Sequence, residues 1–101
     1  MILVIIRMKV LSEKHLELAQ TITSLIGPIR AEVGCKRCDF CQNLEKEDEL
    51  YLVEEWDSRQ NLVGHLRSAH FRILRGAMNL LKEPHQMMFH TLFHPRGMKE
   101  T

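Results

Sequence analysis

Two histidines in the second half of the chain, His65 and His70, have the chemistry of a general base. Because imidazole titrates near neutral pH, either ring could take a proton from a weakly acidic group and hand it on. His65 lies beside Leu62 and Leu66 on the apolar side of a predicted helix, which directs its ring inward rather than toward water. The alternative for both histidines is structural: a ring that bonds a carbonyl or a carboxylate and holds a bend in the helix.

Two aromatic residues and one acidic residue accompany these histidines. Trp56 and Phe71 could stack on an aromatic substrate, although large aromatic side chains at the ends of elements also belong to cores. Glu54 lies on the same face of a predicted strand as Leu50 and Leu52. If that face meets the helices, Glu54 becomes a half-buried carboxylate. Such a carboxylate must be paired or protonated, which makes Glu54 a candidate for substrate binding or for a structural ion pair.

Three cysteines at three-residue spacing, Cys35, Cys38 and Cys41, raise the question of a zinc or iron–sulfur site. Because alternate residues of a strand point to opposite faces, we expect Cys35 and Cys41 on one face, about 20 Å apart, and Cys38 on the other. This spacing argues against a shared metal ion. His90 and His94 of the predicted last strand are about 13 Å apart, too far to chelate one ion by themselves.

The length and composition describe one small domain. The chain has 101 residues, of which 45% are hydrophobic and 27% charged, as in an ordinary globular protein. Lys and Arg number 14 against 13 Asp and Glu, so no charge excess favours a nucleic acid or an anionic membrane as partner. No apolar segment approaches the roughly 20 residues of a membrane span, and no signal peptide is recognisable. With an odd number of cysteines, we expect a location in the reducing cytoplasm.

Alternating and β-branched residues predict strands that would position these side chains. The predicted strands are 2–10, 35–43, 49–57 and 86–94. In the first strand every even position is apolar, whereas the odd positions begin apolar, at Leu3 and Ile5, and end charged, at Arg7 and Lys9. Neither face of this strand is therefore a plain solvent face, and Arg7 is expected to face a partner chain.

Two helical regions are predicted between these strands. Ser12 is expected to cap the first, whose apolar stripe runs from Leu16 to Val33 and is interrupted at Pro28, where the helix would kink or end and restart. Gly34 is expected to end this region. Ser58 is expected to cap the second region, which would break or bend at 68–70 and continue to residue 81.

The predicted order is β-α-β-β-α-β, an α+β ferredoxin-like pattern with a four-stranded antiparallel sheet and the helices on one face. The helices can cover only that face, yet the first, third and last strands carry apolar side chains on both. A second copy of the chain, packed sheet to sheet in a two-fold homodimer, would cover the other face. We expect a single domain over residues 1–94 and a flexible C-terminal tail over 95–101.

Several short segments, taken in order, resemble one known family. They are Tyr51-Leu-Val-Glu-Glu-Trp-Asp-Ser58, His65-Leu66, Ser68-Ala-His-Phe71 and, upstream, Gly34-Cys35 after Arg30-Ala-Glu32. Their order and spacing resemble the antibiotic biosynthesis monooxygenase (ABM) domain, whose members include small quinol monooxygenases. The resemblance covers nearly the whole chain, from the first strand to about residue 94.

This resemblance implies a dimeric α+β barrel with a pocket between each sheet and its helices. It implies an enzyme that needs no flavin, haem or metal, in which a deprotonated phenol or quinol itself supplies electrons to dioxygen. His65 or His70 would accept the proton, Trp56 and Phe71 would form pocket walls, and Glu54 would lie at the substrate. A non-catalytic dimeric module of the same fold, binding a hydrophobic small molecule as a sensor or carrier, is the alternative.

The family is also similar to haem-degrading enzymes of the same fold. Their pattern places an Asn on the first strand and a haem-ligating His four residues after the Phe of the second helical region. The first strand of this chain has no Asn, and Arg75 stands four residues after Phe71. Both departures argue against haem breakdown.

Overall fold

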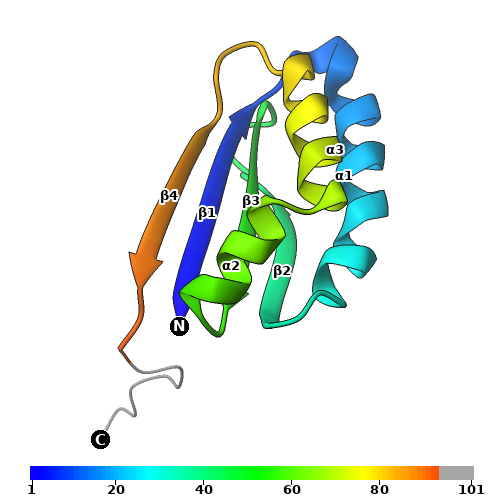
Figure 1. Ribbon diagram of the computed structural model, residues 1–101. Coiled ribbons are helices and arrows are strands. Elements are labelled where there is room, and N and C mark those ends of the chain that lie inside the picture. The colour runs from blue at the N-terminus through cyan, green and yellow to red at the C-terminus, as the bar shows by residue number, and fades with distance from the viewer. Residues whose placement is uncertain (94–101) are drawn as a thin grey trace, which may run out of the picture.

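The four predicted strands form one antiparallel sheet in the computed structural model of the chain, which describes residues 1–93 (Figure 1). They are β1 (Ile2–Lys9), β2 (Cys35–Gln42), β3 (Glu49–Trp56) and β4 (Gln86–Thr91). Their order in the sheet is β2-β3-β1-β4, so the first strand lies in the middle beside β3 and the last strand is an edge. This is the predicted ferredoxin-like arrangement.

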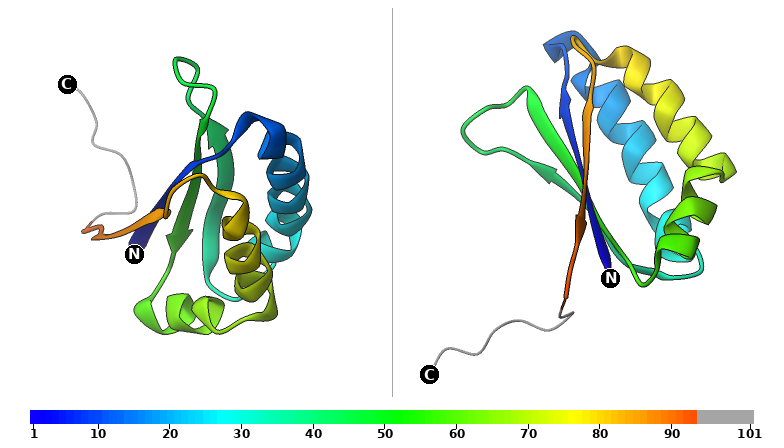
Figure 2. Two further views of the ribbon diagram at one scale, coloured as in Figure 1. Left: turned by 90° about the horizontal axis from the view of Figure 1, so that it is seen from above. Right: turned by 60° about the vertical axis from the view of Figure 1, so that its left-hand side comes forward.

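The helices all lie against one face of this sheet (Figure 2). They are α1 (His15–Arg30), α2 (Arg59–Leu66) and α3 (Ala69–Ala77), with short 3-10 turns at Ser12–Lys14 and Met78–Leu80. The predicted break in the second helical region is confirmed, because α2 and α3 are separate helices. Ser58 and Ser68 cap them, each hydroxyl accepting a hydrogen bond at 3.2 Å from a backbone N–H, that of Asn61 and of Phe71.

The core lies between the sheet and the helices. The even positions of β1 face it, with Val4, Ile6 and Met8 at most 1% exposed. On α1 the buried side chains follow helical spacing. They are Leu18, Ile22, Leu25, Ile26 and Ile29. Burying this many aliphatic side chains supplies the main driving force for the fold.

Two expectations for α1 were wrong. Leu16 and Val33 are 68% and 79% exposed, because Leu16 is about 200° around the helix from the buried Leu18 and Val33 lies beyond the helix end. Ser12 starts a 3-10 turn and does not cap α1 with its side chain. Of the two outcomes expected at Pro28, an end and restart of the helix does not occur, because α1 continues through Pro28 to Arg30.

The last strand is shorter than predicted. It ends at Thr91, which pairs with Ile2, the first residue of β1, so no residue of β1 is left to extend the ladder toward residue 94. Phe93 is 91% exposed. His94 and the predicted tail over 95–101 lie outside the described residues.

A β-bulge changes the predicted arrangement of the cysteines. The register of β2 against β3 shifts between Cys35 and Arg37, so one residue of β2 has no partner. Cys35 and Cys38 therefore both lie on the helix-covered face, whereas Cys41 lies on the opposite face, beside Tyr51. The expectation that Cys35 and Cys41 share a face was wrong, because strict alternation does not hold across a bulge.

The opposite face of the sheet carries no helix among the described residues (Figure 2). Leu3 and Ile5 of β1 lie on it, beside Val53 of β3 and Met88 of β4. At one end it is polar, where Arg7 donates a hydrogen bond to Glu49 at 3.1 Å. No helix in the described part of the chain has the length and apolar character to span a membrane.

Candidate functional site

Six residues form a compact polar and aromatic cluster where the end of α1, the start of β2, the end of β3 and the break between α2 and α3 meet. We call it the His65 cluster; its members are Glu32, Glu54, Trp56, His65, His70 and Phe71. His65 and Glu54 are each 1% exposed and Trp56 is fully buried. The fold thus brings together all five residues that the sequence nominated, and adds Glu32.

Glu32 links the two histidines. It follows α1 by two residues, and its carboxylate lies 3.0 Å from Nδ1 of His65 and 3.0 Å from Nδ1 of His70. Sequence reasoning placed Glu32 only within the segment before Gly34-Cys35 and gave it no chemical role. The contact could not be inferred from spacing, because it depends on how the end of α1 packs against α2 and α3.

Glu54 lies on the other side of the His65 ring. Nε2 of His65 is 3.3 Å from Oε1 of Glu54, close enough for an ion pair although the geometry does not satisfy a hydrogen bond. Trp56 donates a hydrogen bond from Nε1 to the same oxygen at 2.9 Å. The second oxygen, Oε2, is buried and has no hydrogen-bond partner among the described residues. One carboxylate oxygen is therefore held while the other is left for a further donor.

The two carboxylates decide the charge of His65. Burial alone would lower the pKa of His65, but the close contacts and negative charges of Glu54 and Glu32 outweigh it and raise the pKa above its ordinary value. A ring with a carboxylate at each nitrogen is best satisfied with both nitrogens protonated. A raised pKa also makes the neutral ring a stronger base.

Two aromatic rings enclose the imidazole. Trp56 stacks on His65 with ring centroids 4.5 Å apart and planes 25° from parallel. Phe71 meets His65 edge-on at 5.5 Å. Indole and imidazolium in this geometry attract one another. In this arrangement both predicted substrate-stacking residues contact His65.

His70 is the member of the cluster nearest to solvent, with 36% of its side chain exposed. It contacts Glu32 rather than His65. The carboxylate between them gives a continuous series of polar groups from the surface at His70, through Glu32, to the buried His65 and Glu54. Such a series could carry a proton between the interior and water.

The neighbouring thiols of Cys35 and Cys38 lie in an environment that disfavours the thiolate form. Burial, together with the charge of Glu54, raises the pKa of Cys38 to about 12 and also raises the pKa of Cys35. Both thiols thus remain protonated at neutral pH. Within residues 1–93 no three His, Cys, Asp or Glu side chains are grouped as metal ligands would be.

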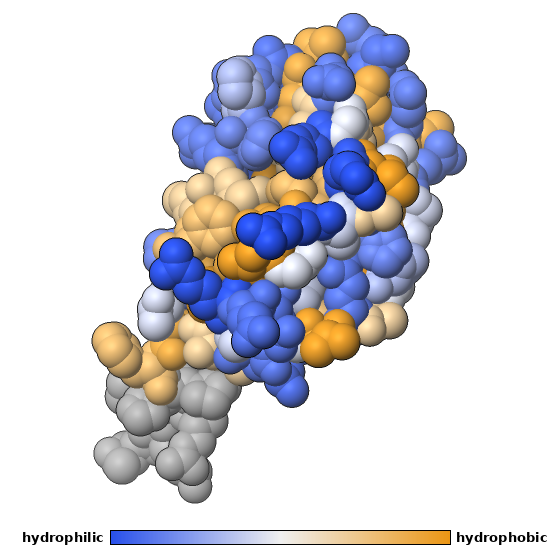
Figure 3. Space-filling view, viewed as in Figure 1, coloured by the Kyte–Doolittle hydropathy of each residue, from blue (hydrophilic) through white to orange (hydrophobic). Residues whose placement is uncertain are grey.

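An apolar hollow of about 320 Å³ lies next to the cluster, between α2 and the helix-covered side of β1 and β4. Figure 3 shows apolar side chains gathered in this region, with hydrophilic ones around them. Its lining consists of Arg59 and six apolar or hydroxyl-bearing residues. They are Ile2, Leu62, Val63, Leu66, Phe89 and Thr91. We call this site the apolar hollow.

The apolar hollow and His65 occupy adjacent sectors of α2. At 100° per residue, the lining residues span an arc from Leu62 to Val63, and His65 lies about 60° beyond Leu62. Leu62 lines the hollow, is 5% exposed, and is the lining residue nearest to His65 around the helix.

Comparison with known proteins identifies the family. The family profile described as antibiotic biosynthesis monooxygenase matches residues 1–75, which include every member of the His65 cluster. The chain belongs to the antibiotic biosynthesis monooxygenase family. No curated protein matches it.

Solved structures are similar to this ABM domain over nearly its whole length. Rv0793 from Mycobacterium tuberculosis has 27% identity and a TM-score of 0.87, covering 95% of this chain and 98% of that one. A conserved protein from Methanosarcina mazei has 30% identity and a TM-score of 0.84, covering 88% and 89%. A structure described as antibiotic biosynthesis monooxygenase, at 19% identity, has a TM-score of 0.84 over 93% and 100%, and shows the fold alone.

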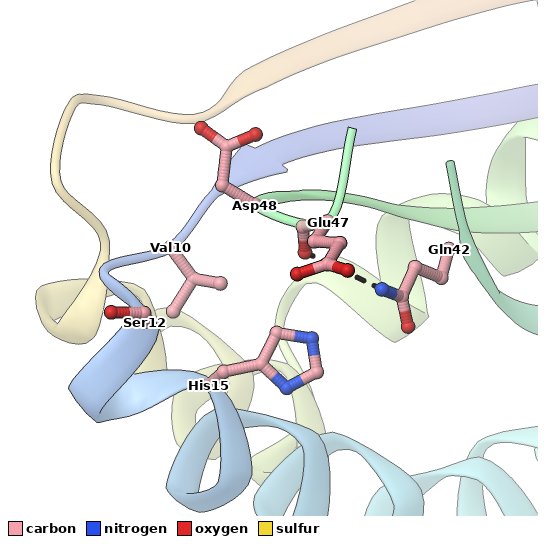
Figure 4. A pocket seen from close by; sticks show the side chains of 6 residues that line it. All are labelled: Val10, Ser12, His15, Gln42, Glu47 and Asp48. Carbon is pink, nitrogen blue, oxygen red and sulfur yellow. Dashed lines mark hydrogen bonds between the residues drawn. The ribbon is translucent and has the colours of Figure 1, made fainter. Parts of the chain in front are cut away.

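A second hollow of about 390 Å³ lies at the other end of the sheet of this ABM domain (Figure 4). Its walls mix one apolar side chain with polar and acidic ones, and the His15 ring points into it. Gln42 donates a hydrogen bond across it to the carbonyl of Glu47 at 3.4 Å. Because Val10 in its lining follows Ile2 by eight residues along an extended segment, about 26 Å, it cannot share a small ligand with the His65 cluster. The apolar hollow is the better site for an aromatic molecule.

Proposed function

We propose that this protein is a monooxygenase that oxidises a small quinol-like or polyketide-like aromatic molecule with dioxygen, without a cofactor. One observation carries the proposal: His65 is held between two carboxylates, in the sector of α2 next to an apolar hollow. Membership in the ABM family makes oxidation the reaction class to test, and the apolar lining suits an aromatic ring.

In the proposed reaction the substrate ring binds in the apolar hollow and loses a hydroxyl proton to the neutral form of His65, at Nε2, the nitrogen that faces Glu54. Because His65 is 1% exposed, Leu62 must turn aside for the hydroxyl to reach this pair. The imidazolium that forms is stabilised by Glu32 and Glu54, and the proton leaves through Glu32 and His70. Trp56 and Phe71 hold the imidazole in place by packing on it.

The electrons come from the substrate itself. A reduced substrate SH2 and one O2 give the oxygenated product SO and one water, so one oxygen atom enters the product and the other leaves as water. The deprotonated, electron-rich ring is the reductant. The protein contributes binding, proton transfer and exclusion of water around the anion.

The proposal includes a homodimer and a reducing compartment. The sheet face without helices carries Leu3, Ile5, Val53 and Met88, which a second copy would cover by packing sheet to sheet. No disulfide joins the three cysteines, Cys35, Cys38 and Cys41, which is typical of proteins in the cytoplasm.

The test is oxygen uptake with a panel of reduced quinols, comparing the parent protein with His65→Gln, His70→Gln and the control His85→Gln. Within residues 1–93, His85 forms no hydrogen bond and no ion pair with a member of the cluster. We expect uptake that depends on the quinol and falls about 100-fold or more in His65→Gln, less in His70→Gln, and not at all in His85→Gln.

A second candidate function is a module that binds a small hydrophobic molecule without turnover. The observation that favours it is the complete burial of His65 beside Leu62. Quinol binding without oxygen uptake by the parent protein would support this module and contradict the monooxygenase.

A further inference from the structure

Arg59 is the single charged residue in the lining of the apolar hollow. It is the first residue of α2, directly after the cap Ser58, and its side chain is exposed. The other lining residues are aliphatic or aromatic, apart from the hydroxyl of Thr91. Within residues 1–93 the Arg59 guanidinium takes part in no hydrogen bond and no ion pair. A fixed positive charge therefore borders an apolar site without an internal counterion.

The arginines of the rest of the described fold are paired. Arg7 bonds Glu49, Arg30 bonds Asp39, and Arg37 lies between Asp39 and Glu55. By contrast, the segment over residues 58–81 carries four arginines and no Asp or Glu, and none of the four forms an ion pair within residues 1–93. These are Arg59, Arg67, Arg72 and Arg75. The segment that contains α2 and α3 thus carries a one-sided positive charge, although the net charge of the chain is only +1.

We propose that the apolar hollow binds an aromatic molecule that carries a carboxylate, with the guanidinium of Arg59 as the partner of that group. This inference rests on the proposed function, since it names the substrate class of the same site. A planar guanidinium matches a carboxylate with two parallel hydrogen bonds. The apolar walls bury the ring and exclude water, which strengthens the ion pair at the rim.

The dimensions of the site favour a one- or two-ring molecule. The hollow measures about 320 Å³, which is at the lower end of small-molecule sites and too small for a lipid chain or a base-paired nucleic acid. Arg59 and His65 are six residues apart on α2, about 9 Å along its axis. A two-ring aromatic molecule spans this separation, so its carboxylate can lie at Arg59 while a hydroxyl at its other end approaches Leu62 and His65.

The experiment compares two ligands that differ by one carboxylate, 6-hydroxy-2-naphthoate and 2-naphthol, by calorimetric or fluorescence titration without oxygen. We expect the parent protein to bind the naphthoate about ten-fold tighter or more. Arg59→Gln should lose most of this preference while its affinity for 2-naphthol changes less than about two-fold. Arg59→Lys should keep part of it. The matched control Arg72→Gln, which removes an exposed arginine of α3 outside the hollow, should retain it.

Three results would overturn the inference: equal affinity for the two ligands, a preference that survives in Arg59→Gln, or binding of neither ligand. The naphthoate affinity should also fall with added salt, whereas the naphthol affinity should not. Oxygen uptake with neutral quinols distinguishes this failure from failure of the proposed function. If neutral quinols are turned over and the carboxylate confers no advantage, the monooxygenase stands and only the anionic substrate class is rejected.

Discussion

At His65 two neighbouring carboxylates prevail over burial. A buried histidine with no partner would be neutral at pH 7, but Glu32 and Glu54 lie at its two ring nitrogens and raise its pKa. The same carboxylates have the opposite meaning for the thiols, since the negative charge of Glu54 adds to burial in raising the pKa of Cys38 to about 12. One acidic pair thus favours a protonated imidazole and protonated cysteines in the same part of the core.

The raised pKa of His65 predicts how stability depends on pH. The folded pKa lies above the unfolded value of about 6.5, so this contribution is fully present below about pH 6.5 and is lost as the pH rises through the folded pKa. The free energy of unfolding should therefore fall between pH 6 and pH 8, by about 1.4 kcal/mol for each unit of the shift. Below pH 8 Cys38 adds little to this slope, since an unfolded thiol titrates near 8.5.

Urea unfolding at pH 6, 7 and 8 measures this slope. Glu32→Gln removes one of the two charges that face His65 and should flatten it, whereas His85→Gln should keep the parent slope. The same flattening should accompany a lower pKa of the His65 ring by NMR titration. A Glu32→Gln variant with the parent slope would show that Glu32 does not hold the proton on His65.

The chemistry of the cluster could be predicted from the sequence only in part. Glu54 and Trp56 could be predicted because strand alternation places them on one face. His65 could be predicted because its helical neighbours are leucines. Glu32 could not be predicted, because its partners lie 33 and 38 residues away in the sequence. No periodicity specifies a contact between the end of one helix and residues of two later helices. The position of Cys35 and Cys38 on the same face of the sheet was also not predicted, because the sequence of β2 carries no clear signal of the bulge.

Among the elements, the turn from α1 into β2 sets the position of Glu32. Gly34 has φ of +85°, a conformation that side-chain-bearing residues rarely adopt, and its carbonyl accepts a hydrogen bond from Asp57 N–H at 2.9 Å. A Cβ at this position would lie within 2.5 Å of Asp57 and Asn61. The prediction that Gly34 would end the first helical region was wrong, because α1 ends at Arg30 with Ala31 as its cap. Gly34 belongs instead to the turn into β2, and the tight approach explains why this turn needs glycine.

Gly34→Ala should destabilise the protein by about 2–4 kcal/mol, because it combines backbone strain with a steric clash. The matched control is Gly76→Ala on the exposed side of α3, where an added Cβ meets nothing within 4 Å. That change should stabilise the protein by about 0.4–1 kcal/mol. Chemical denaturation of the two variants beside the parent tests both signs. Equal stability of the two variants would contradict the argument.

Element boundaries depended on partners that the sequence does not reveal. The pattern of apolar residues gave the number, type and order of the strands, because alternation is a local property. The end of β4 depends instead on where β1 begins, and the exposed Leu16 depends on which side of α1 meets the sheet. Both follow from packing between elements, which local sequence patterns do not predict.

For the whole molecule, the two faces of the sheet have different status. One is covered by α1, α2 and α3, while the other combines the apolar Leu3, Ile5 and Val53 with the ion pair of Arg7 and Glu49. Hydrogen bonds from Arg7 and Tyr51 lower the pKa of Glu49 to about 2, so this pair stays charged at any physiological pH. Burial of the apolar area would drive association with a second copy of the chain, and the ion pair at one end would fix how the two sheets align.

A lysine in the middle of this face should separate the proposed homodimer. In Val53→Lys each copy would bring a charge into the apolar part of the interface, so we expect the dissociation constant to rise at least about 100-fold while each chain stays folded. Ile73→Lys, on the outer side of α3 and 52% exposed in the parent, is the matched control and should stay dimeric. Sedimentation velocity over a range of protein concentrations reports both states. A parent protein that sediments as a single chain at micromolar concentration would exclude the sheet-to-sheet dimer, since Leu3, Ile5 and Val53 would then be stable against water without a second copy.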